Sequence, residues 1–136
     1  MRIVSLLASA TETVFELGAG DALVGRSHEC DYPGWVRGLP SLSRPTFDIG
    51  GSSADIDRRV RERLTAGAPL YEVDEQALAA LVPDVLLTQT HCEVCAVTPG
   101  NVTPGICRRP VATLQTGTLR ARERRSRPVN AARGAV

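Results

Sequence analysis

A short apolar run, Val85-Leu86-Leu87, leads directly into the densest polar and sulfur-bearing segment of the chain, Thr88 to Cys95. Unbroken apolar runs of this length are typical of strands that are buried on both faces of a parallel sheet. Ligand sites of open α/β sheets lie in the crevice beyond the carboxyl ends of such strands. The segment therefore predicts an α/β fold that carries its chemistry after the strand at Val85.

A second polar cluster, Ser27 to Pro33, follows another strand-like run, Ala22–Gly25. If the two strands are neighbours in a parallel sheet, the two clusters meet at the same edge of that sheet. The sequence therefore predicts two strand tips with reactive side chains, which are close in space and far apart along the chain.

The N-terminal segment gives a strand pattern followed by a helix pattern. Ile3–Leu7 predicts a first buried strand, and a helix is expected from about Ala10 to Leu17. Ser9 and Glu12 match a capping box at the start of this helix. The residues expected to face inward from the helix are Val14, Phe15 and Leu17.

The middle of the chain continues the alternation of helices and strands. Ser52 or Ser53 is expected to cap a helix with Ile56, Val60 and Leu64 on one apolar face. Its arginines alternate with acids, which indicates a solvated face and not a nucleic-acid surface. Leu70–Val73 predicts a short strand, followed by a helix that Asp74 caps. Together these patterns predict a Rossmann-like three-layer α/β lobe with a mostly parallel sheet.

Charge divides the chain into two regions. Residues 1–97 hold 8 arginines and 14 acidic residues, whereas residues 98–136 hold 8 arginines and one acid, Glu123. The second region is rich in proline and its apolar residues have no period, so a disordered basic C-terminal tail is predicted there. No aromatic residue follows Tyr71 to stack on bases, so a nucleic-acid partner is not expected.

Cys92 and Cys95 form a C-x-x-C pair, which can bind one metal ion or form a redox pair. His28 and Cys30 could complete a zinc or iron site with them. Two other interpretations stay open: the cysteines could pack a turn as small apolar residues, or line a cleft for an organic ligand. No hydrolase, kinase or metalloprotease motif is present, so the chain is not expected to be an enzyme.

The sequence shows neither a signal peptide nor an apolar stretch long enough to span a membrane. As written, the chain is therefore expected to be cytoplasmic.

Several of these segments occur together, in the same order, in a known family. Arg2–Glu12, Gly25–Pro33, Leu70–Asp74 and Pro83–Val97 resemble the N-terminal lobe of ABC-transporter substrate-binding proteins of the iron-siderophore/vitamin B12 class. They are most similar to the cobalamin-binding subgroup, with Ala8 where a proline is expected. The resemblance covers about residues 2–97.

This resemblance implies two α/β lobes joined by a long helix, with cobalamin or another corrinoid held in the cleft between them. It also implies a membrane permease and its ATPase as partners. By the pattern of the family, the loops after three strands face the cleft. The candidate ligand-binding residues are Ser9, Ala10, Thr11, His28, Glu29, Cys30, Tyr32, Gln89, Cys92 and Cys95.

After Val97 the family continues into a linker helix and a second lobe, and here the sequence becomes Arg/Pro-rich instead. This predicts a truncated or frameshifted product, with a lobe at residues 1–97 and a tail at residues 98–136. The alternatives to corrinoid binding are a cytosolic metal- or thiol-redox protein that uses His28, Cys30, Cys92 and Cys95, or a non-functional fragment.

Overall fold

The computed structural model describes residues 1–92, 94–106 and 112–114. Four strands form a parallel sheet in the order β2-β1-β5-β6. Their bounds are Ile3–Ser5 for β1, Leu23–Arg26 for β2, Val85–Gln89 for β5 and Ala112–Leu114 for β6. The strands predicted at Ile3, Ala22 and Val85 are therefore confirmed, although β1 ends two residues earlier than predicted.

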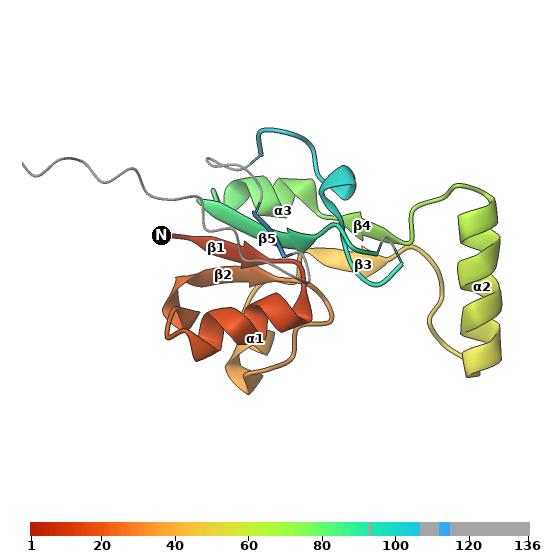
Figure 1. Cartoon of the computed structure of the whole chain (residues 1–136), viewed down its shortest axis with the longest axis horizontal. Helices are drawn as coiled ribbons and strands as arrows, with labels where there is room; N and C mark the ends of the chain where they lie inside the picture. Colours follow the sequence, from red (N-terminus) through yellow and green to blue (C-terminus); the bar gives the residue numbers. More distant parts are fainter. Residues whose placement is uncertain (93, 107–111, 115–136) are drawn as a thin grey trace, which may run out of the picture.

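Helices cover both faces of this sheet. The helix α1 (Ala8–Glu16) lies on one face and α3 (Glu75–Ala80) on the other (Figure 1). Because side chains alternate along a strand, Ile3 joins one hydrophobic cluster with Val14 of α1, and Val4 joins the other with Leu78 of α3. The predicted three-layer α/β lobe is confirmed.

A second, two-stranded sheet accompanies the first. The strand β3 (Ser43–Pro45) pairs antiparallel with β4 (Tyr71–Val73). The predicted strand at Leu70–Val73 therefore forms, but it does not join the parallel sheet. The sequence did not predict β3, because Ser-Arg-Pro has neither an apolar run nor alternation. Three short 3₁₀ turns complete the described elements: η1 (Gly20–Ala22), η2 (Gly34–Gly38) and η3 (Pro99–Asn101).

The start of α1 differs from the prediction. Leu7 occupies the N-cap position in an extended conformation, and no side-chain cap bond is found there among the described residues. The predicted Ser9–Glu12 capping box is therefore wrong, because the helix begins before Ser9. Leu17 is also wrong as an inward-facing residue: it follows the last helical residue and is 76% exposed. At α3 the prediction holds, since Asp74 Oδ1 accepts from the backbone N–H of Ala77.

The helix α2 (Ser53–Thr65) begins with the predicted cap, because Ser52 and Asp55 form a reciprocal capping box. Its apolar side chains, however, do not enter the core: none of its residues is buried within the described part of the chain. The helix extends to one side of both sheets (Figure 1). Its arginines pair with neighbouring acids, including Arg58 with Asp55 and Arg61 with Asp57.

The disorder predicted from residue 98 onward is wrong for residues 98–106 and 112–114. Val97 and Val102 are buried in the hydrophobic cluster of Val4 and Leu86, and β6 pairs with β5. These few apolar residues have no period along the chain, so their burial in the core could not be predicted from the sequence. The predicted disorder of residues 107–111 and 115–136 lies outside the described residues.

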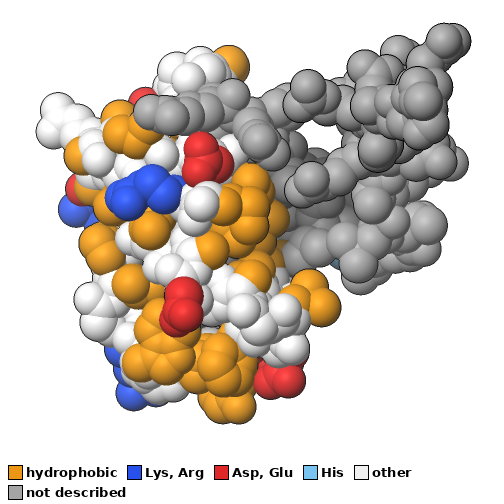
Figure 2. Space-filling view, turned by 90° about the vertical axis from the view of Figure 1, so that its left-hand side faces the viewer, with side chains coloured by type: hydrophobic (Ala, Val, Ile, Leu, Met, Phe, Trp, Pro, Cys, Tyr) orange, Lys and Arg blue, Asp and Glu red, His pale blue; other side chains and the backbone are white. Residues whose placement is uncertain are grey.

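Within the described residues, no helix is both long and apolar enough to cross a membrane. In Figure 1 the parallel strands run from the side of the N-terminus toward β3, β4 and the loop after β5. Figure 2 shows the opposite end of the lobe, where hydrophobic side chains lie among polar ones and the charged side chains are scattered. The polar clusters named above all follow the carboxyl ends of the strands.

Candidate functional site

The carboxyl ends of β2, β1 and β5 lie side by side, with β1 in the middle. The backbone connects them directly, since Ser27 N–H donates to Ser5 O at 2.9 Å and Leu6 N–H donates to Leu87 O at 2.8 Å. The two strands that carry the polar clusters are not neighbours, because β1 lies between them, but both clusters follow carboxyl ends at the same edge of the sheet. We call residues Ser27–Tyr32 the β2 tip and residues Gln89–Cys95, apart from the undescribed Glu93, the β5 tip.

At the β2 tip the chain turns inward at Cys30. The N–H of Cys30 donates to Ser27 O, and Ser27 Oγ accepts from the N–H of Glu29 at 3.1 Å. Cys30 Sγ lies 3.0 Å from Thr11 Oγ1 and 3.9 Å from Ser5 O. Cys30 and Thr11 are each 1% exposed. The polar atoms of these two residues therefore satisfy each other inside the lobe.

The first-strand loop is also less open than the family pattern implies. Ala10 is 1% exposed, so Ala10 and Thr11 pack against the sheet and do not line a surface. Ser9 is exposed, and its backbone carbonyl accepts from Thr13 Oγ1. Of the three candidates in this loop, only Ser9 has a side chain that a ligand could reach directly.

His28 is held at the surface by the second sheet. Its Nδ1 lies 2.9 Å from Ser43 Oγ of β3, and its backbone N–H donates to the same oxygen at 3.2 Å. Partial burial lowers the pKa of His28, and nearby Arg26 lowers it further, while Glu29 opposes both effects. His28 is therefore a neutral imidazole at neutral pH, with Nε2 remaining for another partner.

Gln89 shapes the β5 tip. Its side-chain carbonyl accepts from the backbone N–H groups of His91 and Cys92, each at 2.9 Å. Its amide nitrogen donates to the backbone carbonyl of Cys92. Gln89 is 6% exposed. It was expected to contact a ligand, and its polar atoms instead hold the turn that carries Cys92.

Cys92 and Cys95 face each other at this tip. The Cys95 thiol donates to Cys92 Sγ, and the two sulfur atoms are 2.7 Å apart. Cys92 is half-buried and Cys95 is exposed. The hydrogen bond to Cys92, with smaller contributions from desolvation and from the charges of Cys92 and Glu29, raises the pKa of Cys95.

Tyr71 of β4 connects the two tips. Its hydroxyl donates to Val94 O at 2.9 Å, and its ring lies 5.7 Å from the ring of His28, tilted by 41°. Burial raises the pKa of Tyr71, and the negative charges of Glu29, Cys95 and Cys92 raise it further. Tyr71 therefore contacts the β2 tip through His28 and the β5 tip through Val94.

Sequence reasoning missed Tyr71 and Ser43 as site residues. Tyr71 belongs to the Leu70–Asp74 segment that carries part of the family resemblance, and this could have marked it. Ser43 gave no signal, because β3 itself was not predicted. Tyr32, which was predicted, is 52% exposed at the β2 tip and meets Phe15 edge-to-face with ring centroids 6.0 Å apart.

The metal site proposed from His28, Cys30, Cys92 and Cys95 is not assembled. Among the described residues, no group of three or more histidine, cysteine or acidic side chains is arranged to hold a metal ion. The physical reason is the inward turn at Cys30, which buries its sulfur against Thr11. Zinc or iron binding by these four residues is therefore not supported.

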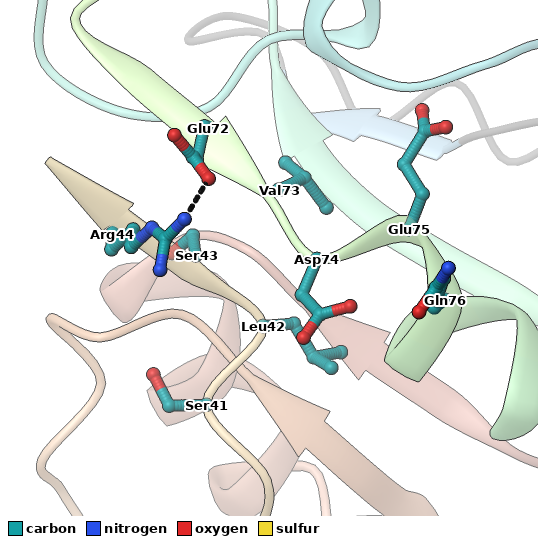
Figure 3. A pocket seen from close by; sticks show the side chains of 9 residues that line it. All are labelled: Ser41, Leu42, Ser43, Arg44, Glu72, Val73, Asp74, Glu75 and Gln76. Carbon is teal, nitrogen blue, oxygen red and sulfur yellow. Dashed lines mark hydrogen bonds and ion pairs between the residues drawn. The ribbon is translucent and has the colours of Figure 1, made fainter. Parts of the chain in front are cut away.

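A groove of about 650 Å³ opens beside the β2 tip, between the second sheet and α3. Figure 3 shows its side chains, with the Arg44 guanidinium paired to Glu72. Asp74 caps α3 and Glu75 accepts from the N–H and hydroxyl of Thr103, so these carboxylates are already engaged. Ser43, which lines the groove, also binds His28. The lining residues are Ser41, Leu42, Ser43, Arg44, Glu72, Val73, Asp74, Glu75 and Gln76.

No family model matches the sequence, and no curated protein matches it. Among solved structures, the chain is similar to the periplasmic vitamin B12 binding protein BtuF of Vibrio cholerae, with a TM-score of 0.50 and 21% sequence identity. The similarity covers 86% of this chain and 35% of that protein. It shows that the chain has the fold of part of a periplasmic binding protein, and it spans about one third of that protein's length.

Proposed function

We propose that the chain is a non-catalytic binding module for a corrinoid, and that the carboxyl edge of its parallel sheet forms the wall facing the ligand. The observation that carries the proposal is the likeness to a vitamin B12 binding protein over most of the chain. A second observation supports it: the tips of three strands meet at the edge where open α/β sheets bind ligands.

The exposed side chains at this edge suit a large ligand with a polar rim. Glu29 can accept hydrogen bonds from the amide side chains of a corrinoid, and the exposed Tyr32 ring offers a flat apolar surface. Imidazole and thiol groups, which His28 and Cys95 supply, are donors that suit a cobalt centre. The buried residues Thr11, Cys30 and Gln89 act behind this surface and fix the shape of the tips.

A single lobe supplies one wall of a cleft. Ligand pockets bury most of the surface of their ligand, so contact with one wall gives weaker binding than a closed site. Tight binding is proposed to require a second wall, which corresponds to the part of the B12 binding protein that this chain does not span. A permease and an ATPase belong to the proposal as the partners of the assembled binding protein.

The proposal is tested by titrating the folded full chain with hydroxocobalamin and measuring bound corrinoid by equilibrium dialysis and visible absorbance. We expect saturable binding, and a loss of about tenfold for Glu29→Ala, which removes an acceptor and so one hydrogen bond worth about 1.4 kcal/mol. Arg61→Ala on α2 is the matched control, because Arg61 pairs with Asp57 of the same helix and belongs to neither strand tip, so binding should stay unchanged.

Saturable binding that Glu29→Ala weakens and Arg61→Ala does not would support the proposal. Absence of binding by a chain that shows a cooperative unfolding transition would overturn it and favour an inert fragment. Equal binding by all three proteins would also overturn it, because the ligand would then not use this edge.

A further inference from the structure

We propose that Cys92 and Cys95 form a reversible thiol–disulfide site that reacts with small-molecule disulfides. This activity goes beyond corrinoid binding and does not depend on it. The observation that carries it is the placement of the two sulfur atoms, which are 2.7 Å apart at the outer edge of the lobe.

The geometry requires little movement to form the bond. A disulfide has its sulfur atoms about 2.05 Å apart, and its two Cα atoms must be close enough for the Cβ vectors to converge. The side chains of Cys92 and Cys95 already converge on each other in the reduced chain. Oxidation therefore needs only a short approach of the two sulfurs, without rearrangement of the sheet beneath them.

The surrounding residues hold both ends of the pair. On the side of Cys92, the Gln89 side chain bonds to both the backbone N–H and the backbone carbonyl of that residue. On the side of Cys95, the Tyr71 hydroxyl bonds to the carbonyl of the preceding residue, Val94. The two side chains that hold this turn, Gln89 and Tyr71, belong to the strands β5 and β4. They keep the two cysteines close together, which favours a disulfide between Cys92 and Cys95 over separate disulfides with other thiols.

Access distinguishes this pair from Cys30. Cys95 is exposed and Cys92 is half-buried, whereas Cys30 is 1% exposed and packed against Thr11. A disulfide in solution can therefore reach Cys95 directly, and it can reach Cys30 only when the lobe opens. The raised pKa of Cys95 is consistent with a proton that lies between the two sulfurs.

The reaction balances as a two-step exchange. The thiolate of Cys95, formed by loss of its proton, attacks a small-molecule disulfide RSSR; a Cys95–SR bond forms and one thiol leaves. Cys92 then loses its proton and attacks the Cys95 sulfur, which releases the second thiol and forms the Cys92–Cys95 bond. Overall two cysteine thiols are oxidised and one RSSR is reduced to two RSH.

The test uses the full chain equilibrated in buffers of glutathione and glutathione disulfide, then quenched with acid and analysed by peptide mass mapping. We expect the mass of the peptide with both cysteines to fall by two hydrogens, with no glutathione attached to it. Dithiothreitol should restore the two hydrogens. The Cys92→Ser variant should instead accumulate glutathione on Cys95. Cys30→Ser is the matched control and should leave the Cys92–Cys95 disulfide unchanged.

Cys107 lies outside the described residues, so a Cys107→Ser sample is run in parallel and should also keep the disulfide. The proposal is overturned if wild-type chain at equilibrium carries glutathione on Cys95 and no internal disulfide. It is equally overturned if either cysteine pairs with Cys30 or Cys107. Corrinoid binding plays no part in these readouts, so this proposal and the preceding one succeed or fail separately.

Discussion

The two strand tips carry the same reactive residue type and present it in opposite directions. Cys30, at the β2 tip, is 1% exposed and lies against Thr11, while Cys95, at the β5 tip, is exposed. The difference comes from the turns that follow the strands. Ser27 binds back into its own turn and draws Cys30 inward, whereas the Gln89 side chain supports the β5 tip from beneath.

This comparison shows that a position just beyond a strand does not by itself leave a side chain exposed. The polar atoms of Thr11, Cys30 and Gln89 are engaged within the lobe, so they shape the edge. His28, Glu29, Tyr32 and Cys95 form its outer surface. Substitutions should therefore separate into two groups, with changes in stability for the first and changes in reactivity or binding for the second.

The largest expected effect is on the strand that leads to the β2 tip. A Cβ atom at Gly25 would lie 2.7 Å from Leu42 Cδ1 and 2.8 Å from Leu81 Cδ1. Gly25→Ala should therefore destabilise the lobe by about 1–3 kcal/mol through overpacking, measured by urea unfolding. Gly38→Ala is the control, because no atom lies within 4 Å of its added Cβ. Equal stability of the two variants would show that β2 is loosely packed.

The next effect is at the β5 tip. Gln89→Ala removes the acceptor for two backbone N–H groups and the donor to the Cys92 carbonyl. We expect a loss of about 1–2 kcal/mol in the free energy of unfolding. The Cys92–Cys95 disulfide should also form less readily in glutathione buffers. An unchanged disulfide equilibrium in Gln89→Ala would contradict the supporting role of this side chain.

A smaller effect should separate the two cysteines directly. Cys30→Ala removes a buried sulfur and should lower the free energy of unfolding by about 1 kcal/mol. Cys95→Ala changes an exposed side chain and should stay within about 0.5 kcal/mol of the wild type under reducing conditions. Thermal and urea unfolding of both variants in dithiothreitol measure this difference. A larger loss of stability for Cys95→Ala than for Cys30→Ala would contradict the burial of Cys30 and the exposure of Cys95.

The smallest effect concerns His28. Since its pKa is lowered in the folded chain, the unfolded chain binds a proton first as the pH falls. The contribution of His28 to the free energy of unfolding is therefore complete at a pH above its pKa in the unfolded chain, about 6.5. This contribution decreases as the pH falls below that pKa, and it levels off below the pKa of His28 in the folded chain. Urea midpoints between neutral and acidic pH should show this decrease, and His28→Gln should reduce it. If the urea midpoint of His28→Gln depends on pH as steeply as that of the wild type, His28 is not the source of the decrease.

The strands β1, β2 and β5 of the parallel sheet could be predicted because each is a short apolar run, which is visible in the local sequence without knowledge of the strand it pairs with. The sequence did not predict β3, whose pairing with β4 depends on a distant segment, or the burial of Val97 and Val102. Leu17 was assigned to the core by helical period, yet the helix ends before it.

For the candidate site, the sequence predicted that the two polar clusters lie at one edge of the sheet, and the ligand-binding role of their residues stays a prediction. It could not tell that Cys30 turns inward, because nothing in the local sequence states which carbonyl its N–H will meet. Tyr71 was missed for a related reason: it reaches His28 and Val94 only through the second sheet. The role of a residue cannot be predicted from a single sequence when it depends on contacts between segments that are far apart along the chain.

The opposite orientation of the two tips is tested most directly by thiol labelling of the reduced, folded chain, with each cysteine followed separately by peptide mass mapping. Cys30 should react at least about 100-fold more slowly than Cys95, since a buried thiol reacts only after local opening that costs several kcal/mol. Denaturant should abolish this difference. Labelling of Cys30 at the rate of Cys95 in the folded chain would contradict the inward turn of the β2 tip.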